Sequence, residues 1–525
     1  MRPGHFRYDE LMPHRGKSLR FARNVGFNVL GQVGTAAASF FAIPFLLHRL
    51  GGQTYALYIL MHAVAGYLAL LSFGAGTATV KYVAQFNAAQ DARGLRAVLR
   101  YSAAMHLFGA LAAAVFLLVG VRFCAVRLFH VPEPLLPAAI LVLRCAAGAA
   151  IFTGLFQFAC AVLQGLQRFD WNSLLAFSQN GLMPVGAAAA VALGLGLSGV
   201  AGWYVALSVG GGLLALSLAR SALPAWRRGD GGEGLGLKAY GGYSLGLWLG
   251  ALASMVSFQS DKIFLARGVS LAGLTLYAVP AGLLQRLAVL PAIIAAVLMP
   301  MLSEVQGPDA SEALRRMYLK SVRFLLWAVL PAYALLFALM PQFLGLWLGG
   351  DFPALSVWPA RLLVLSQAVY ALNFIPNSVA AGRDRPWLLA GAAWAQALLS
   401  VLAWILLIPR YHLLGVALGS LIAQVLPTCV YLAVLHRRVL GLAPARYLDE
   451  GLRAPLVSAA CLLAVVFPLH AWASGWGRLI LLAAGGAAVY CASAWLSLTA
   501  EDRDLLRRFL RWEPRAGQAE KTNVL

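Results

Sequence analysis

Residues 24–47 read NVGFNVLGQVGTAAASFFAIPFLL, a stretch without a single charged side chain. A helix of this length reaches about 36 Å, enough to cross a hydrocarbon core of about 30 Å. The preceding segment (1–23) is basic, but the apolar stretch is too long for the core of a signal peptide, and no A-x-A cleavage site follows it closely. We therefore expect an uncleaved first membrane span, which would make the chain an integral membrane protein.

Comparable stretches recur along the whole chain. Of its 525 residues, 61% are hydrophobic and 12% are charged, against about 25% charged in soluble domains. This composition excludes a soluble globular fold and predicts an all-α protein of about fourteen transmembrane helices. The spans are expected near residues 24–47, 54–78, 100–121, 135–162, 172–195, 198–219, 240–262, 272–300, 322–340, 356–381, 387–409, 412–435, 453–470 and 478–498.

The basic residues predict how the chain is oriented. The net charge is +21, which in a soluble protein would suggest nucleic acid as a partner. Here 31 of the 41 Lys and Arg residues fall in the tails and even-numbered loops, and 7 in the odd-numbered loops. Because Lys and Arg are retained on the cytoplasmic side, both termini are predicted to be cytoplasmic, and no nucleic-acid partner is expected.

The two halves of the chain resemble each other. YALYIL near Tyr58 resembles LTLYAV near Tyr277, and two further pairs, near Trp171 and Trp387 and near Gly199 and Gly415, share one identical offset in sequence position. Six spans separate the copies, so the repeat is parallel, as in transporters whose substrate path lies between two halves. The predicted organisation is a basic N-tail (1–23), a six-helix bundle (24–220), a cytoplasmic linker (221–239), a second six-helix bundle (240–438), helices 13 and 14 (439–498) and an amphipathic C-tail (499–525).

Arginines inside the apolar segments are the first candidates for a binding site. Arg286, beside Gln285, is predicted midway along span 8, where a charge costs about 2.5–3.5 kcal/mol. One interpretation is a cation that lines a cavity for an anionic substrate, and the alternative is a structural ion pair, for instance with Asp261. Arg144 is a weaker cavity candidate, and Arg361 is expected to be structural.

Asp261 is the only one of the twenty acidic residues within or at the edge of an apolar segment. One hypothesis makes it a proton or sodium coupling site. The alternative, which the sequence favours, is a carboxylate at a helix end paired with Lys262 or Arg286.

Polar residues on several spans predict a wet lumen. In span 1, Asn24, Asn28, Gln32, Thr35 and Ser39 follow at spacings of 4, 4, 3 and 4, and so form one stripe. Gln157 of span 4 and Asn373 of span 10 are related by the same offset as the repeated segments. Hydrogen bonds between helices would explain any one of these residues, but stripes on several spans favour a central polar cavity.

Other chemistry finds no support in the sequence. The six cysteines form no CxxC pair, so no metal site and no disulfide framework are expected. No nucleotide-binding motif is present, and no cofactor is expected. The loops are too short for a catalytic domain, so the chain is expected to be a transporter rather than an enzyme.

Several segments, in order, resemble the bacterial polysaccharide biosynthesis proteins of the O-antigen flippase type. They begin with RNVGFNVLGQVGTAAASFFAIPFLLHRLGGQTYALYIL at residues 23–60, in which Asn24, Pro44, Leu50, Gly51 and Tyr58 fit the family pattern. The others are LLSFGAGTATVKYVAQ (70–85), QSDKIFLARGVSLAGLTLYAVPAGL (259–283, with Asp261 at the usual acidic position), AAGRDRPW (380–387) and YHLLGVALGSLIAQ (411–424). The resemblance covers about residues 20–435.

This resemblance implies a fold of two six-helix bundles, shared with the multidrug extruders and the peptidoglycan-precursor flippases. It implies a polyprenyl-pyrophosphate-linked glycan as substrate, moved from the inner to the outer leaflet of the bacterial cytoplasmic membrane. It also implies membrane lipids and other polysaccharide assembly proteins as partners. An anionic lipid diphosphate suits a groove that contains Arg286 and Arg144.

Four alternatives remain. An ion-coupled drug antiporter on the same fold predicts acidic residues in the lumen, and Asp261 is the one candidate. A peptidoglycan-precursor flippase fits the same segments less closely. A glycan polymerase or ligase predicts a large periplasmic loop, which the chain lacks, and a purely structural scaffold does not explain the polar stripes.

Overall fold

A computed structural model describes residues 15–224, 234–295, 310–349, 354–383 and 385–498, and within these ranges the chain is helical and has no strands. The side chains of residues 15–30, 68, 69 and 386 are not part of the description. The predicted amphipathic C-tail (499–525) lies outside the described residues. Twelve helices of the described part are long and apolar enough to cross a membrane, so the predicted all-α membrane fold is confirmed, while the number fourteen stays a prediction.

The chain divides into two compact units. The N-terminal unit comprises residues 1–286 and 393–419, and the C-terminal unit comprises residues 287–392 and 420–525. The boundaries that the sequence predicts for two six-helix bundles, 24–220 and 240–438, stay a prediction.

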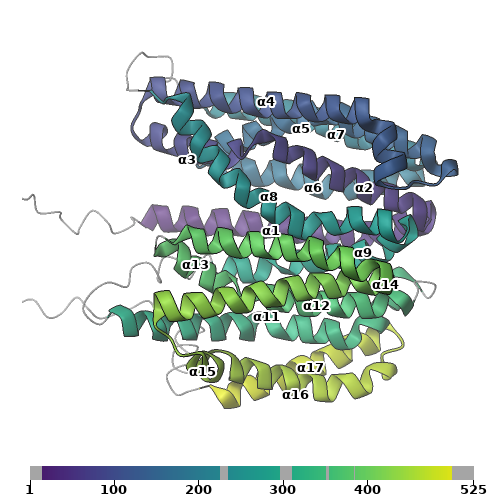
Figure 1. Cartoon of the computed structure of the whole chain (residues 1–525), viewed down its shortest axis with the longest axis vertical. Coiled ribbons are helices and arrows are strands. Elements are labelled where there is room, and N and C mark those ends of the chain that lie inside the picture. The colour runs from purple at the N-terminus through teal and green to yellow at the C-terminus, as the bar shows by residue number, and fades with distance from the viewer. Residues whose placement is uncertain (1–14, 225–233, 296–309, 350–353, 384, 499–525) are drawn as a thin grey trace, which may run out of the picture. The chain divides into compact units, whose positions relative to one another are not determined.

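The N-terminal unit is built from α1 to α9 and part of α14 (Figure 1). Its elements are α1 (Arg15–Leu50), α2 (Gly52–Ala69), η2 (Leu70–Ser72), α3 (Ala75–Ala88), α4 (Ala92–Phe123), η3 (Cys124–Leu128), η4 (Glu133–Leu135), α5 (Leu136–Gly165), α6 (Phe169–Ala192), α7 (Gly196–Ala222), α8 (Leu237–Gly268) and α9 (Leu271–Leu287). Helix α5 packs against α4 and α7, α1 packs against α6, and α3 packs against α8.

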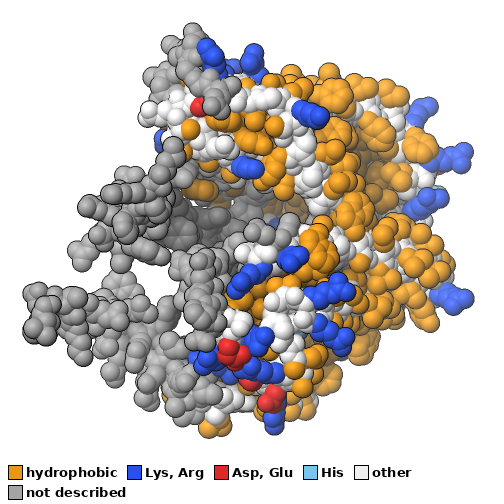
Figure 2. Space-filling view, turned by 60° about the vertical axis from the view of Figure 1, so that its left-hand side comes forward, with side chains coloured by type: hydrophobic (Ala, Val, Ile, Leu, Met, Phe, Trp, Pro, Cys, Tyr) orange, Lys and Arg blue, Asp and Glu red, His pale blue; other side chains and the backbone are white. Residues whose placement is uncertain are grey.

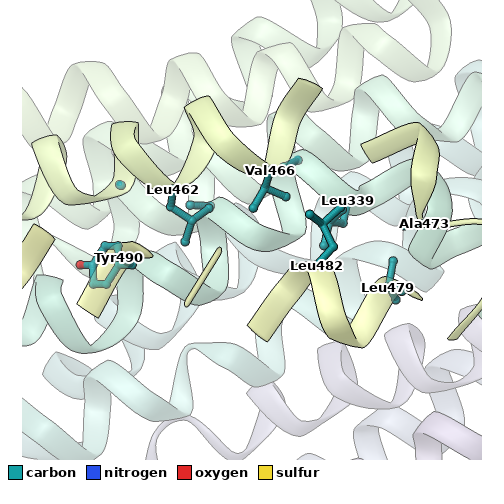
Figure 3. Close-up of a cluster of buried hydrophobic side chains, with 10 residues drawn as sticks. Leu339, Leu462, Val466, Ala473, Leu479, Leu482 and Tyr490 are labelled. Carbon is teal, nitrogen blue, oxygen red and sulfur yellow. The ribbon is translucent and has the colours of Figure 1, made fainter. Parts of the chain in front are cut away.

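The C-terminal unit is arranged around α11. Its elements are α11 (Ala310–Leu348), η6 (Ala354–Ser356), α12 (Val357–Ala371), α13 (Phe374–Gly382), the remaining parts of α14 (Pro386–Leu435), η7 (His436–Leu440), α15 (Pro444–Arg446), η8 (Tyr447–Arg453), α16 (Ala454–Leu469), η9 (His470–Trp472) and α17 (Trp476–Ser497). Leu339 of α11, Leu462 and Val466 of α16, and Leu482 and Tyr490 of α17 form its apolar core (Figure 3).

Hydrophobic side chains cover much of the outer surface. On the face in Figure 2 they spread over the helices, and Lys and Arg gather at the edges of this apolar surface. On α4, for example, Leu107, Phe108, Leu111 and Val119 are each at least half exposed. Such a surface is stable against hydrocarbon and would aggregate in water.

Three predicted spans are broken rather than continuous. Span 2 is interrupted at η2 and at Phe73 and Gly74, which adopt φ values of +50° and +73°. Span 8 ends as α9 at Leu287, and a turn at residue 288 separates it from helical residues 289–295. Span 10 is divided at residues 372–373 into α12 and α13. The first two breaks are separated by nearly the same offset that relates the two halves of the sequence.

Within α14 the chain turns back at His412, which has a φ of +48°. Trp404 before the turn donates its indole N–H to the carbonyl of Val416 after it, at 3.3 Å. Gly415 lies so close to the carbonyl oxygen of Leu407 that a Cβ there would be 2.3 Å from it. The run therefore comprises two antiparallel helices, as the spans predicted at 387–409 and 412–435 require.

Side chains of α8 occupy the break in span 2. The indole N–H of Trp248 donates to the carbonyl of Leu70 at 2.7 Å, and the hydroxyl of Ser244 donates to the carbonyl of Phe73 at 2.6 Å. A Cβ on Gly74 would lie 2.5 Å from the carbonyl oxygen of Ser244, so only glycine fits here. The carbonyl of Phe73 thus gains a donor, as a buried peptide group requires, and the carbonyl of Leu70, which accepts from the N–H of Phe73 at 3.0 Å, gains a second one.

Replacing Ser244 with Ala should lower the free energy of unfolding by about 1–3 kcal/mol, because the carbonyl of Phe73 would lose its donor. The matched control is Ser257→Ala. Ser257 also donates to a carbonyl, that of Ala253 at 3.0 Å, but Ala253 lies inside the regular helix α8 and so has a main-chain donor too. Thermal unfolding in detergent should show the larger loss for Ser244→Ala, and equal losses would contradict this assignment.

In the C-terminal unit, Arg361 donates a hydrogen bond to a main-chain carbonyl that a proline leaves without its helical donor. Pro341 has no N–H, so it leaves the carbonyl of Phe337, four residues earlier in α11, without its helical donor. The Nε of Arg361 donates to this carbonyl at 2.9 Å, and its Nη2 donates to that of Ala338 at 3.3 Å. The aromatic rings of Phe337, Trp358 and Phe467 lie 5.2–5.5 Å from the guanidinium carbon, so this buried cation links α11, α12 and α16.

A double-mutant cycle should therefore couple Arg361 to Pro341. Arg361→Met should lower the free energy of unfolding by about 2–3 kcal/mol in the natural background. The same change should cost at least about 1 kcal/mol less after Pro341→Ala, because an alanine at that position restores an N–H for the Phe337 carbonyl. Additive effects in thermal or denaturant unfolding would show that the proline has no part in the role of Arg361.

Candidate functional site

Arg286 lies in the last turn of α9, where the C-terminal end of the helix dipole favours a cation. Its Nη1 donates to the main-chain carbonyl of Thr35 on α1 at 3.0 Å. The ionisable groups that act on it electrostatically are the phenols of Tyr55 and Tyr58 on α2. Among the described residues no carboxylate pairs with Arg286, so its positive charge is met by dipoles and not by an anion.

Gln285 and Asp261 form their contacts with residues of α8 and not with Arg286. Gln285 donates its side-chain N–H to the carbonyl of Phe258 on α8 at 3.4 Å. Asp261, which is 4% exposed, accepts from the main-chain N–H of Lys262 at 2.8 Å, and the Lys262 ammonium lies 3.6 Å from the same carboxylate oxygen. Lys262 also donates to the carbonyl of Phe258 and to the side chain of Gln259. Asp261 is therefore paired with Lys262 rather than with Arg286.

An aromatic row leads away from Arg286 inside the N-terminal unit. The rings of Tyr55 and Tyr58 are 5.5 Å apart, Tyr58 and His62 are 4.8 Å apart, and His62 and Tyr204 of α7 are 5.7 Å apart. The Nε2 of His62 is buried and has no hydrogen-bond partner among the described residues. Residues 55, 58 and 62 share one face of α2, and this spacing was the signal from which they could have been found in the sequence.

Next to Tyr204 lies a small cavity of about 20 Å³, room for about one water molecule. Gln157 and Thr153 of α5, His106 of α4 and Ser72 of η2 line it, so it adjoins the break in span 2. The Nδ1 of His106 lies 2.8 Å from the carbonyl of Ser102, which can only accept, so Nδ1 carries the proton and Nε2 is left as an acceptor. That Nε2 is buried and has no partner among the described residues, and no sequence pattern pointed to it.

In the C-terminal unit, Asn373 stands at the break between α12 and α13. Its Nδ2 donates to the hydroxyl of Thr428 at 3.0 Å, and the same hydroxyl oxygen accepts from Gln424 at 3.2 Å. The side-chain amide oxygen (Oδ1) of Asn373 is buried and has no partner among the described residues, and the same is true of the hydroxyl of Tyr431. Asn373 is thus half satisfied by its neighbours and has one acceptor to offer.

The remaining predicted residues are not brought to these groups. Arg144 is exposed on α5, about 180–220° around the helix from Thr153 and Gln157. Gln32 is exposed on α1, whereas Thr35 is half-buried and Ser39 is buried. Asn24 and Asn28 lie in α1, and their side chains are outside the described residues. No group of three or more metal-ligating side chains occurs in the described part of the chain.

Comparisons with known proteins agree with this fold. A family model described as polysaccharide biosynthesis protein matches residues 21–306. A search of curated proteins found no match.

Solved structures of low sequence identity share the fold. An inward-facing multidrug resistance MATE family transporter of the MOP superfamily aligns with a TM-score of 0.61 and 16% identity, over 77% of this chain and 96% of that one. The lipid II flippase MurJ, inward closed, aligns with a TM-score of 0.59 and 16% identity, over 93% and 100%. A MOP superfamily transporter from Pyrococcus furiosus aligns with a TM-score of 0.52 and 16% identity, over 79% and 94%. The chain therefore has the fold of this transporter superfamily.

Proposed function

Because the chain belongs to the polysaccharide biosynthesis protein family, we propose that it is a flippase for a polyprenyl-pyrophosphate-linked oligosaccharide. It moves this lipid from the inner to the outer leaflet of the bacterial cytoplasmic membrane by alternating access, and both of its termini are cytoplasmic. The product serves surface polysaccharide assembly, of O-antigen or exopolysaccharide, together with other assembly proteins. In this proposal the chain is a secondary transporter and not an enzyme.

The observation that carries the proposal is the environment of Arg286. The guanidinium of Arg286 is half-buried, donates to one carbonyl, and has two phenols within electrostatic range. It has therefore lost part of its hydration without gaining an ion pair among the described residues. A diphosphate supplies the missing anion, and its oxygens accept from a guanidinium in pairs. Tyr58 beside Arg286 adds a neutral hydroxyl as a further donor. In this proposal Gln285, Gln157 and Asn373 are neutral amides for the hydroxyl groups of the glycan.

A drug antiporter on the same fold fits the charges less well. Cationic substrates favour unpaired carboxylates, and the carboxylate of Asp261 is compensated by Lys262 at 3.6 Å. A peptidoglycan-precursor flippase is the second candidate, because its substrate is a lipid diphosphate too and would use Arg286 in the same way. The mass of the lipid that accumulates without this protein separates the two.

If Arg286 binds the diphosphate, Arg286→Ala should reduce export at least about a hundredfold, because a buried charge-assisted contact of about 3 kcal/mol is lost. Arg286→Lys keeps the charge but not the fork of donors and should be partly active. The measurement is mass spectrometry of polyprenol-linked lipids extracted from a deletion strain complemented with each variant. One glycan-diphosphate lipid should accumulate in the deletion strain and in Arg286→Ala.

The matched control is Arg267→Gln, which removes one positive charge from an exposed position of α8. It should restore export fully at the same protein level. Normal export by Arg286→Ala would contradict a substrate role for Arg286, and the absence of any accumulated lipid in the deletion strain would argue against a flippase altogether.

If Asp261 is a structural partner of Lys262, Asp261→Asn should leave an unpaired buried ammonium and lower the thermal unfolding midpoint. The double variant Asp261→Asn/Lys262→Met removes both charges and should recover most of that loss. Transport in proteoliposomes should keep its dependence on an imposed ion gradient in the double variant. Loss of that dependence, with stability restored, would instead identify Asp261 as the coupling site.

A further inference from the structure

The first three turns of α4 carry three arginines that line one cavity. Arg93, Arg96 and Arg100 line a space of about 480 Å³ together with Tyr101 and residues 234–236. Their spacings of 3 and 4 place them on one face of the helix. None of the described residues that line the cavity carries a carboxylate.

The opposite wall comes from a distant part of the chain and is held in place. Asp91 caps α4 by accepting from the N–H of Gly94 at 2.6 Å, and its other oxygen accepts from the N–H of Gly234 at 3.4 Å. The ring of Tyr101 packs against that of Tyr240 on α8, with centroids 6.0 Å apart. The starts of α4 and α8 therefore lie side by side (Figure 1), and the cavity is a built feature rather than a chance gap between loops.

The wall formed by the three arginines suits a phosphate group. Guanidinium groups donate to phosphate oxygens in pairs, and they do so more tightly where several converge. The volume is within the range of small-molecule sites and admits a phosphate-bearing headgroup. The positive-inside rule places arginines on the cytoplasmic side but does not require them to line one concave surface. Asp91, the nearest carboxylate in sequence, accepts hydrogen bonds from two main-chain N–H groups.

The same face of α4 continues as an exposed apolar stripe. Leu107, Leu111 and Leu118 follow Arg93 and Arg100 at helical spacing within about 20° of one line, and each is at least half exposed. Leu107 begins about 10 Å along the axis from Arg100. Arginines at one end of a helix face and exposed leucines below them match the headgroup and the acyl chain of a phospholipid.

We propose that this face of α4 binds an anionic phospholipid of the leaflet at which α4 begins, predicted to be the cytoplasmic one. The phosphate lies in the cavity against Arg93, Arg96 and Arg100, and an acyl chain lies along Leu107, Leu111 and Leu118. The site is separate from Arg286 and does not depend on the proposed transport function.

The test is lipid retention by the purified full chain in native mass spectrometry, with phosphatidic acid and phosphatidylcholine of identical acyl chains as probes. Wild type should retain phosphatidic acid over phosphatidylcholine. Arg93→Gln/Arg100→Gln should weaken the retention at least about tenfold, because each arginine near a lipid headgroup contributes to anionic-lipid affinity. The matched control is Arg122→Gln/Arg127→Gln, which removes two exposed charges at the far end of α4 and in η3 and should change retention less than twofold. Equal effects of the two double variants would overturn the site.

A second pair of measurements separates a lipid from a free phosphate. Inorganic pyrophosphate should displace phosphatidic acid only partly, and Leu111→Gln should weaken phosphatidic acid severalfold while leaving the arginines intact. Complete displacement by pyrophosphate, with no effect of Leu111→Gln, would mean that the cavity recognises phosphate alone, and the lipid assignment would fall. Because these readouts involve no transport, failure here leaves the flippase proposal standing, and the reverse also holds.

Discussion

Hydrocarbon offers no hydrogen-bond partner to a peptide group, and this constraint governs both units of the molecule. Long unbroken helices satisfy it by themselves, as α4 and α5 do. Where a helix breaks, the freed carbonyls need donors from elsewhere, and the structure supplies them with buried side chains. Trp248 and Ser244 serve the break in span 2, and Arg361 serves the carbonyl that Pro341 releases. Each of these hydrogen bonds also joins two different helices. The side chain that satisfies a freed carbonyl therefore also fixes the position of its own helix against the broken one.

The buried charges show how differently the same side chain can be used. Arg361 is surrounded by three aromatic rings and bonded to two carbonyls, and its charge is fully occupied in linking helices. Lys262 and Asp261 offset each other. Arg286 has one carbonyl and two phenols but no anion among the described residues. This contrast, rather than burial alone, makes Arg286 the candidate for binding an anionic substrate.

Several of the candidate polar groups lie at or near the helix breaks. His106 and Gln157 border a cavity beside η2, Arg286 lies two residues before the turn that follows α9, and Asn373 stands between α12 and α13. A break opens room for a polar side chain in an otherwise close-packed bundle, and it weakens the local helix enough for movement. The proposed transport by alternating access would need both properties.

By itself the sequence determined the membrane fold class and most span positions, and it predicted the orientation of the chain and Arg286 as a candidate binding residue. It could do so because the length of an apolar segment and the placement of Lys and Arg are local properties. It also contained the spacing of Tyr55, Tyr58 and His62, although no motif marks it. Only the tertiary structure decided that span 2 breaks at residues 70–74, since LLSFG contains no charged residue and no proline, and the side-chain donors to its carbonyls come from α8, which is remote in the sequence. It likewise decided that Asp261 pairs with Lys262 and that Arg144 faces away from Gln157. The partner of a side chain and the buried face of a helix depend on neighbours that are remote in sequence. The spacing of residues along one helix does not predict which neighbours these are.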